Sequence, residues 1–336
     1  MAYKRIVVGV DVAKRTLACC ILIRTESKTS KDYLEMSNSI EGFNKLHNQL
    51  KKHRIIRNRI RIVMGPTSIY HCACRQVLHS YGYEVCQIDT NQSYHFRQFL
   101  GTILKNDKVD SYALAQFGLF RDNLRAWQPT TMKYSEIQNL MKRRQTVDNL
   151  IRQEQNRLDG HDEKQLSSST DQLILASIEY HEAELKKIDK LIKEAIAQDG
   201  KLQSDVKRLQ TIPGIGEICA RQLAMLFNTR DFKNSRELVS FLGLCPRENT
   251  SGTSVRGTSS ISKHGPSDIR KNLFMGARSA CFTCKGTLPQ KEYYSRLVNA
   301  RKAATSALCA VARKQVCIAF SIWKDEKAVF INPYAP

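Results

Sequence analysis

Short apolar runs separated by polar turns dominate the first third of the chain, and they predict alternating strands and helices. In residues 39–52, for example, Phe43, Leu46 and Leu50 recur at helical spacing on one face. Strands are expected at 5–11, 17–24, 32–37, 59–64 and 83–88, and helices at 39–52, 68–82 and about 107–121. Strands and helices in this order are typical of an α/β layer fold.

The middle of the chain has a different period. Apolar residues recur there at spacings of three, four and seven, first at Ile137, Leu140, Met141, Val147, Leu150 and Ile151, then at Ile178, Leu185, Ile188, Ile192 and Ile196. A polar stretch at 159–172 separates the two groups. This pattern predicts two long helices joined by a solvated loop, a coiled-coil hairpin that serves either as a spacer or as a dimer contact.

The last third returns to shorter patterns. It opens with the sequence LQTIPGIGEICARQLA at 209–224, continues through a Gly/Ser/Thr-rich loop at 249–265, and ends in mostly helical patterns rich in Ala, Arg and Lys. These changes divide the chain into three predicted domains, 1–128, 129–205 and 206–330.

Charge narrows the possible partners. The 336 residues include 53 Lys and Arg against 32 Asp and Glu, a net charge of +21, while 42% are hydrophobic, which excludes a disordered chain. Such an excess favours a polyanion such as nucleic acid, bound largely through its phosphates. A ribosomal-type protein or a basic membrane-surface protein would also be basic, so charge alone does not decide.

Neither a membrane nor an oxidising compartment is expected. No apolar run approaches the roughly 20 residues of a membrane span, and the N-terminus does not resemble a signal peptide. Eleven scattered cysteines are expected to be reduced thiols. The pair Cys281 and Cys284 could hold zinc, but a second pair is lacking in the sequence. The expected location is the bacterial cytosol, in association with the nucleoid.

Three aspartates form the first candidate site. Asp11 closes the first strand, and Asp107 and Asp110 lie one helical turn apart on one face. Asp11 could instead be a turn or capping residue, and the pair could be a solvated first turn that the helix dipole favours. Together, the three acids suit one or two hard divalent cations acting on a phosphate.

The sequence IPGIG at 212–216, before an apolar helix, resembles a helix-hairpin-helix element. In such an element Gly214 and Gly216 would let backbone N–H groups approach a DNA phosphate. Glycine turns of this kind are also common in ordinary loops, and that alternative stays open.

A loop rich in hydroxyl groups and glycine at 243–273 supplies a candidate nucleophile. Ser251 precedes Gly252, which leaves its hydroxyl exposed to attack a phosphodiester. Other serines compete with it: Ser254, Ser259, Ser260 and Ser262. The loop could equally bind phosphate without a nucleophile. Candidate phosphate-binding cations are Arg247, Arg256, Lys263, Arg270 and Lys271, joined by Arg301, Lys302, Arg313 and Lys314 in a later helical segment that could also be a generic basic surface.

Taken together, these motifs make the chain resemble a known family, the DEDD transposases of the insertion sequence one-ten family, which also contains the Piv-type site-specific DNA invertases. VGVDVAK (8–14) is similar to the family's first acidic motif, and NDKVDSYALA (106–115) to its paired-Asp motif. Motifs of the C-terminal domain follow in order: IPGIGEICA (212–220), FLGLCPRENTSGTSVRG (241–257), ISKHGPSDIRKNLF (261–274) and RKAATSALCAVARK (301–314).

The resemblance implies a fold and a mechanism. It implies a RuvC-like, ribonuclease-H-like domain at 1–128 that binds Mg²⁺, or Mn²⁺ in its place, through four acids. A coiled coil at 129–205 would mediate assembly into a homo-oligomer, a dimer or tetramer. The domain at 206–330 would supply a serine, here Ser251, that links covalently to DNA, in sites composed from different subunits. A structured non-coding guide RNA, or bridge RNA, would direct the protein to donor and target DNA.

One position departs from the family pattern. The family's second acid, a Glu, aligns with Gly65 in VMGPTSIY, and glycine has no side chain to bind a metal. Either this copy is catalytically impaired or another acid replaces the Glu, with Asp89 at the end of the next strand as the first alternative.

The sequence therefore predicts a DNA transposase or recombinase that acts through a phosphoserine intermediate with magnesium-binding acids. Three alternatives stay open: a nucleic-acid-binding relative that has lost catalysis, a RuvC-like nuclease without a covalent intermediate, and a site-specific DNA invertase.

Overall fold

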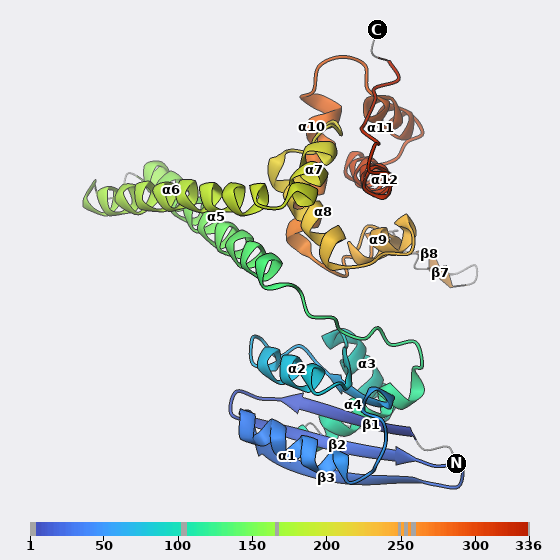
Figure 1. The fold of residues 1–336 in the computed structure, drawn as a ribbon. Helices are drawn as coiled ribbons and strands as arrows, with labels where there is room; N and C mark the ends of the chain where they lie inside the picture. Colours follow the sequence, from blue (N-terminus) through green and yellow to red (C-terminus); the bar gives the residue numbers. More distant parts are fainter. Residues whose placement is uncertain are drawn as a thin grey trace. The chain divides into compact units, whose positions relative to one another are not determined.

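The structure, a computed structural model, divides into two compact units, residues 1–129 and 130–336 (Figure 1). It describes residues 5–101, 106–164, 168–247, 250–251, 255–256 and 260–334.

The first unit contains a mixed five-stranded sheet in the order β3-β2-β1-β4-β5. Its strands are β1 (Arg5–Val12), β2 (Thr16–Arg24), β3 (Thr29–Ser37), β4 (Ile60–Met64) and β5 (Glu84–Gln87). The first three strands pair antiparallel, whereas β4 runs parallel to β1 and β5 parallel to β4. The expected α/β architecture of this part of the chain is confirmed.

Helices cover both faces of this sheet. They are α1 (Ile40–Lys51), α2 (His71–Ser80), α3 (Thr90–Phe99) and α4 (Asp107–Phe120), and a short 3-10 turn, η1 (Arg57–Arg59), precedes β4. Alternate residues of β1 serve two cores. Ile6, Val8 and Val10 pack with α1 and α2, while Val7 packs with α4 on the other face.

The sequence pattern missed α3. This helix buries none of its residues completely, so it lacks the apolar periodicity on which the prediction of helices relied. Its N-terminus is fixed by a polar contact instead, since the Asp89 carboxylate accepts a hydrogen bond from the Asn91 N–H at 2.8 Å.

Backbone contact between β1 and α4 sets the depth at which α4 lies on the sheet. A Cβ placed on Gly9 would lie 1.9 Å from the Ser111 carbonyl oxygen and 2.4 Å from the Ala115 nitrogen. One Cβ on Gly118 would lie 2.6 Å from side-chain carbons of both Val7 and Val63. The two glycines therefore allow the helix to approach the strands more closely than any side chain would permit.

The second unit begins with two long helices, α5 (Met132–Lys164) and α6 (Ser168–Ala197), which pack side by side. The expected polar loop at 159–172 is wrong for most of its length, because α5 continues to Lys164 and α6 already begins at Ser168. Much of this stretch is Ser, Asp and Gly, which are weaker helix formers, so the helices extend into it from both ends against the local propensity. A coiled-coil geometry of the pair stays a prediction.

The remaining helices share one hydrophobic core with this pair. They are α7 (Gly200–Leu209), α8 (Glu217–Thr229), α9 (Ser235–Phe241), α10 (Ser267–Phe282), α11 (Pro289–Asn299) and α12 (Ala304–Lys324). Ile137 of α5 and Ile192 of α6 lie in the same core as Leu223 of α8 and Val316 of α12. The long helices and the C-terminal helices thus form one unit here, and the three-domain division stays a prediction.

Shared ion pairs fasten the long helices to α8. Asp189 of α6 accepts hydrogen bonds from Arg144 Nε of α5 at 2.8 Å and from Arg221 Nη1 of α8 at 3.1 Å. Burial opposes ionisation of Asp189, but the two guanidinium groups outweigh it and hold the pKa of this carboxyl below its usual value. The carboxylate therefore stays charged and joins three helices.

Among the helices that the structure describes, α12 alone is long and apolar enough to cross a membrane, judged by length and composition. Half of its most apolar window is buried inside the protein, where Val311, Val316 and Ala319 are fully enclosed. The core helix of a soluble protein passes the same test, so α12 is weak evidence for a membrane.

Replacing Gly9 with Ala should lower the free energy of unfolding by about 1–3 kcal/mol, because the new methyl group overlaps the backbone of α4. Chemical denaturation of the purified protein would measure the change. Gly65→Ala is the matched control: a Cβ there has nothing within 4 Å, so stability should be unchanged or higher by about 0.4–1 kcal/mol. Equal destabilisation by both variants would contradict the contact.

Candidate functional site

Asp11 stands near the end of β1, on the face of the sheet that α4 covers. Side chains alternate along a strand, so Asp11 shares this face with Val7 and Gly9. Its side chain is partly exposed, as expected for a carboxylate at the rim of a core.

The paired aspartates begin α4. Asn106 caps this helix, its Oδ1 accepting a hydrogen bond from the Val109 N–H at 2.8 Å, which places Asp107 and Asp110 in the first turn. Gly118 of α4 lies over Val7, whereas Ser111 lies over Gly9, so the helix runs opposite to β1 and its N-terminus approaches the Asp11 end of the strand. The fold therefore brings all three predicted acids to one edge of the sheet.

An arginine that the sequence analysis missed lies against this group. Arg97 of α3 donates from Nη1 to Asp110 Oδ1 at 2.8 Å. Within the part of the chain that the structure describes, no three His, Cys, Asp or Glu side chains are grouped closely enough to hold a metal ion. The acids present are suitable ligands for a divalent cation by type, but as arranged they do not complete a metal site.

Gly65 follows β4 directly beside the Asp11 strand, since Val10 of β1 pairs with Met64 of β4. The glycine has no positive φ, and a Cβ would have nothing within 4 Å. Neither the backbone nor the space around it requires glycine, so this corner of the sheet has room for a longer side chain.

The segment after Gly65 is held by a buried histidine. His71 Nδ1 accepts a hydrogen bond from the Thr67 N–H at 3.3 Å. Burial, assisted by the nearby Arg75 charge, lowers the pKa of His71, which favours the neutral ring that this hydrogen bond requires.

Asp89, proposed as a substitute ligand, already has a structural role as the cap of α3. One of its oxygens accepts the Asn91 N–H. Metal binding by Asp89 would therefore depend on its second oxygen or on the loss of the cap.

Ser251 lies in a pair of short strands within the loop that was expected to lack regular structure. β6 (Pro246–Arg247) pairs with β9 (Ser260–Ile261), and β7 (Thr250–Ser251) pairs with β8 (Val255–Arg256). We call residues 246–261 the serine arm. The register sets Ser251 opposite Val255 and Thr250 opposite Arg256. The side chains of Ser251 and Arg256 lie outside the described residues, as do Ser254 and Ser259 entirely; Ser260 is exposed and Ser262 partly buried.

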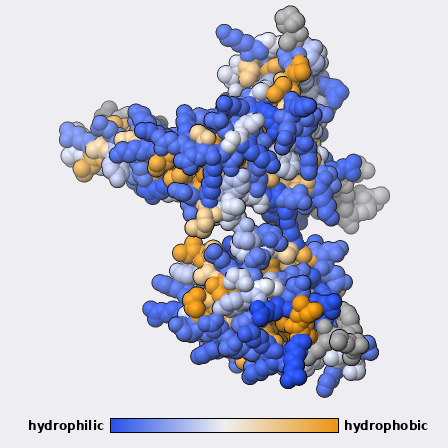
Figure 2. All heavy atoms as spheres, viewed as in Figure 1, coloured by the Kyte–Doolittle hydropathy of each residue, from blue (hydrophilic) through white to orange (hydrophobic). Residues whose placement is uncertain are grey.

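Most of the predicted phosphate-binding cations are exposed. They are Arg247, Lys263, Lys271, Arg301, Lys302, Arg313 and Lys314, and much of the face in Figure 2 is hydrophilic. Arg270 differs from them, because it is partly buried and its Nη1 donates to the Leu242 carbonyl at the end of α9 at 3.1 Å. Arg270 therefore positions α9 against α10, and its availability for phosphate is limited.

Gly214 and Gly216 have different surroundings. Gly214 has a φ of +83°, and a Cβ there would lie 2.1 Å from the Gly276 carbonyl oxygen of α10, so this glycine serves close packing. Gly216 is the exposed N-cap of α8 and has open space around it. The helix-hairpin-helix interpretation stays a prediction.

The thiol of Cys281, in the cysteine pair considered for zinc, is poorly suited to bind that metal. Burial raises the pKa of the Cys281 thiol to about 11, which opposes the thiolate that zinc requires.

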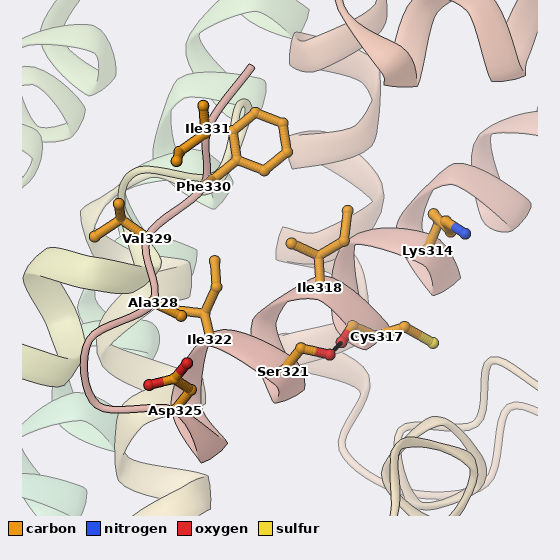
Figure 3. Close-up of a pocket in the computed structure, with 10 residues that line it drawn as sticks. All are labelled: Lys314, Cys317, Ile318, Ser321, Ile322, Asp325, Ala328, Val329, Phe330 and Ile331. Atoms are coloured by element: carbon orange, nitrogen blue, oxygen red, sulfur yellow. Dashed lines mark hydrogen bonds between the residues drawn. The ribbon is translucent and has the colours of Figure 1, made fainter. Parts of the chain in front are cut away.

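A groove of about 450 Å³ lies between α12 and residues 325–331, with Ile318 and Phe330 facing each other across it (Figure 3). Its charged lining residues are Lys314 and Asp325, and the rest is mostly apolar.

Comparison with known proteins gives a consistent result along the chain. A model of DEDD transposases of the IS110 type, described as "Transposase", matches residues 8–161, and a model described as "Transposase IS116/IS110/IS902 family" matches residues 206–295. The pilin gene-inverting proteins of Moraxella lacunata and Moraxella bovis are each 24% identical over 322 residues, covering 95% of this chain and 96% of theirs.

Two partial matches cover shorter stretches of the chain. The transposase for insertion sequence element IS1111A of Coxiella burnetii is 30% identical over 130 residues, 38% of this chain and 35% of that protein. Among solved structures, RuvC of T. thermophilus in complex with a Holliday junction substrate matches 37% of this chain and 99% of its own, at 13% identity and a TM-score of 0.26. The two family models, in the expected order, place this chain in the IS110 family of transposases, whose members carry out DNA recombination.

Proposed function

We propose that this protein cuts and rejoins DNA through a covalent link between DNA and Ser251. The observation that carries the proposal is the arrangement of the two motifs: Asp11 and the acids of α4 share one sheet edge, and Ser251 lies in the serine arm near exposed cations. Membership of the IS110 family supports this reading.

The proposed serine step exchanges one phosphodiester bond for another. The Ser251 hydroxyl oxygen attacks phosphorus, the bond from phosphorus to the oxygen of one DNA strand end breaks, and that oxygen takes up a proton to become a free hydroxyl. The serine loses its own proton, for which a nearby base or a polarised phosphate is required. Attack of another strand end on the phosphoserine reverses the step and frees the serine, so no external energy source is consumed.

Exposed cations would hold the DNA during this exchange. Arg247, which pairs with Ser260 at the base of the serine arm, and Lys263 are close to Ser251 in sequence and exposed. Their charges would balance the negative charge that grows on the phosphate oxygens during attack. Lys271, Arg313 and Lys314 would extend this contact along the backbone.

A divalent cation belongs to the proposal, since RuvC-like transposases generally use one. When bound at Asp11, Asp107 and Asp110, Mg²⁺ or Mn²⁺ would neutralise phosphate charge. These three carboxylates are oxygen ligands of the right kind, but one ligand is missing because Gly65 stands at the fourth position. In addition, Arg97 is already paired with Asp110. We therefore expect Arg97 to compete with the cation for Asp110.

The remaining partners are proposed from the family resemblance. They are donor and target DNA, a structured non-coding guide RNA, and further copies of this chain in a dimer or tetramer. The long helices α5 and α6 are the proposed assembly contact.

Two alternative functions each have a supporting observation. Site-specific DNA inversion is supported by the similarity to pilin gene-inverting proteins over 95% of the chain. A nucleic-acid-binding protein with impaired catalysis is supported by Gly65 and by the Arg97–Asp110 ion pair. A RuvC-like nuclease would cut DNA without leaving a covalent adduct.

Ser251→Ala should abolish the covalent protein–DNA adduct while leaving DNA affinity within about twofold, because the cations remain. Denaturing electrophoresis of the protein after incubation with labelled DNA would detect the adduct. Ser260→Ala, a change of an exposed serine in the same arm, is the control and should keep it. An adduct that persists in Ser251→Ala would assign the nucleophile elsewhere, and cleavage without any adduct would favour the nuclease.

DNA affinity should fall linearly with salt on a double-logarithmic plot, with a slope of about −0.9 for each phosphate neutralised. Fluorescence anisotropy between about 50 and 200 mM salt would measure the slope. Arg313→Gln and Lys314→Gln should each reduce it by about one. A slope near zero for the unaltered protein would refute phosphate-dominated binding.

Gly65→Glu should raise the affinity for Mn²⁺ about tenfold or more, because the new carboxylate has room at the sheet edge beside Asp11. Calorimetric titration of Mn²⁺ into the protein measures the affinity without any assay of recombination. Gly200→Glu is the matched control, since that glycine also has open space but lies at the start of α7. Equal affinities of the Gly65 variant and the control would show that position 65 is not at a metal site.

A further inference from the structure

The outward face of α10 carries a stripe of cations and large apolar side chains. Lys271, Met275, Arg278 and Phe282 follow one another at spacings of four, three and four residues, so they lie in line along one side of the helix. The stripe extends over about 16 Å, from the rise of about 1.5 Å per residue. Leu273 on the opposite side is completely buried, so the stripe faces away from the core.

The apolar members of the stripe are unusually exposed. Met275 is 47% and Phe282 59% exposed; Arg278 is exposed between them and Lys271 is exposed before Met275. The ring of Phe282 contacts the ring of Tyr294 of α11 edge to face, with 5.1 Å between the ring centroids. Clustered exposed apolar side chains of this kind mark binding surfaces.

Two hollows meet at Met275. One, of about 260 Å³, lies beside the base of the serine arm and is lined by apolar side chains with Arg270 and Lys271. The other, of about 460 Å³, runs along α10 past Arg278 and Phe282. The lining residues described for both hollows include no acid. Asp268, the acid in the first turn of α10, binds Gln222 of α8 at 3.2 Å.

We propose that this face of α10 is a binding track for single-stranded nucleic acid, with phosphates at Lys271 and Arg278 and unpaired bases on Phe282 and in the hollow beside Met275. The inference rests on the proposed function only in taking nucleic acid as the partner. A basic groove with interleaved aromatic side chains is the usual form of single-strand binding sites.

Duplex DNA fits this face less well. Paired bases are already stacked and present only their edges in the grooves, which leaves the exposed Phe282 ring and Met275 thioether of α10 without a partner. A guide RNA and a DNA strand displaced during recombination both offer unpaired bases on a phosphate backbone. Both sources share the chemistry that the stripe recognises.

The test compares full-length Phe282→Ala with the unaltered protein on labelled oligomers of one length: oligo-dT, oligo-U, an abasic DNA strand and a DNA duplex. We expect Phe282→Ala to weaken binding of at least one base-bearing single strand about 5- to 100-fold. Binding of the abasic strand and of the duplex should change less than twofold. Phe120→Ala at the C-terminal end of α4, at a side chain 74% exposed, is the matched aromatic control and should change nothing.

The cations are tested in the same way. Arg278→Gln should weaken binding of the abasic and the base-bearing strands alike, since both carry the phosphates. Lys190→Gln, an exposed cation of α6 paired with Glu194 at 3.9 Å, removes the same charge away from the stripe and should have a smaller effect. Met275→Ala provides a second apolar variant if Phe282→Ala alters the melting temperature.

The outcomes separate the possibilities. If Phe282→Ala loses binding to oligo-U alone, the track binds RNA. If it loses binding to oligo-dT alone, the track binds a DNA strand, and loss of binding to both shows that the track accepts both. For Phe282→Ala, equal losses on the abasic strand and the base-bearing strands, or no loss on any strand, overturn the proposal. Ser251→Ala should bind single strands normally, so failure of the serine chemistry and failure of the track are distinguishable.

Discussion

The first unit depends on direct contact between the backbones of β1 and α4. At Gly9 the Ser111 carbonyl occupies the place where a side chain would begin. This contact fixes the height, direction and register of α4 over the sheet, and with them the position of Asp107 and Asp110 relative to Asp11. The second unit uses the same device where Gly214 meets Gly276, which seats one face of α10 against the turn before α8 and turns the other outward.

Charges in this protein have two distinct uses. Buried and half-buried acids are paired and hold helices together: Asp205 of α7 pairs with Arg208 of the same helix and also accepts a hydrogen bond from Asn228 of α8. Breaking such a pair leaves an uncompensated charge in a poorly solvated place, which costs far more than an exposed pair contributes. The surplus of cations is left at the surface, where it is available to phosphates. A net charge of +21 is therefore compatible with a well-packed core.

Sequence patterns predicted the sheet well because its central strands are buried on both faces and therefore appear as continuous apolar runs. The first strand was expected at 5–11 and is Arg5–Val12. Elements held by polar contacts escaped prediction: α3 buries none of its residues completely, and the serine arm consists of two-residue strands within a glycine-rich loop. The acids of the candidate site could be foreseen from a strand end and a helical pair. Arg97 could not, because its contact with Asp110 depends on how α3 folds back toward α4. The choice among the loop serines depends on side-chain positions that spacing alone cannot supply.

The shared carboxylate of Asp189 has a mechanical consequence. It fastens α5, α6 and α8 at one point, and about 32 Å of α6 extends from it to the N-terminal end of that helix, at a rise of about 1.5 Å per residue. The paired long helices are therefore anchored in the core that also supports α10 and the base of the serine arm. A contact made at the far end of α6 would act through this anchor on the elements that share the core.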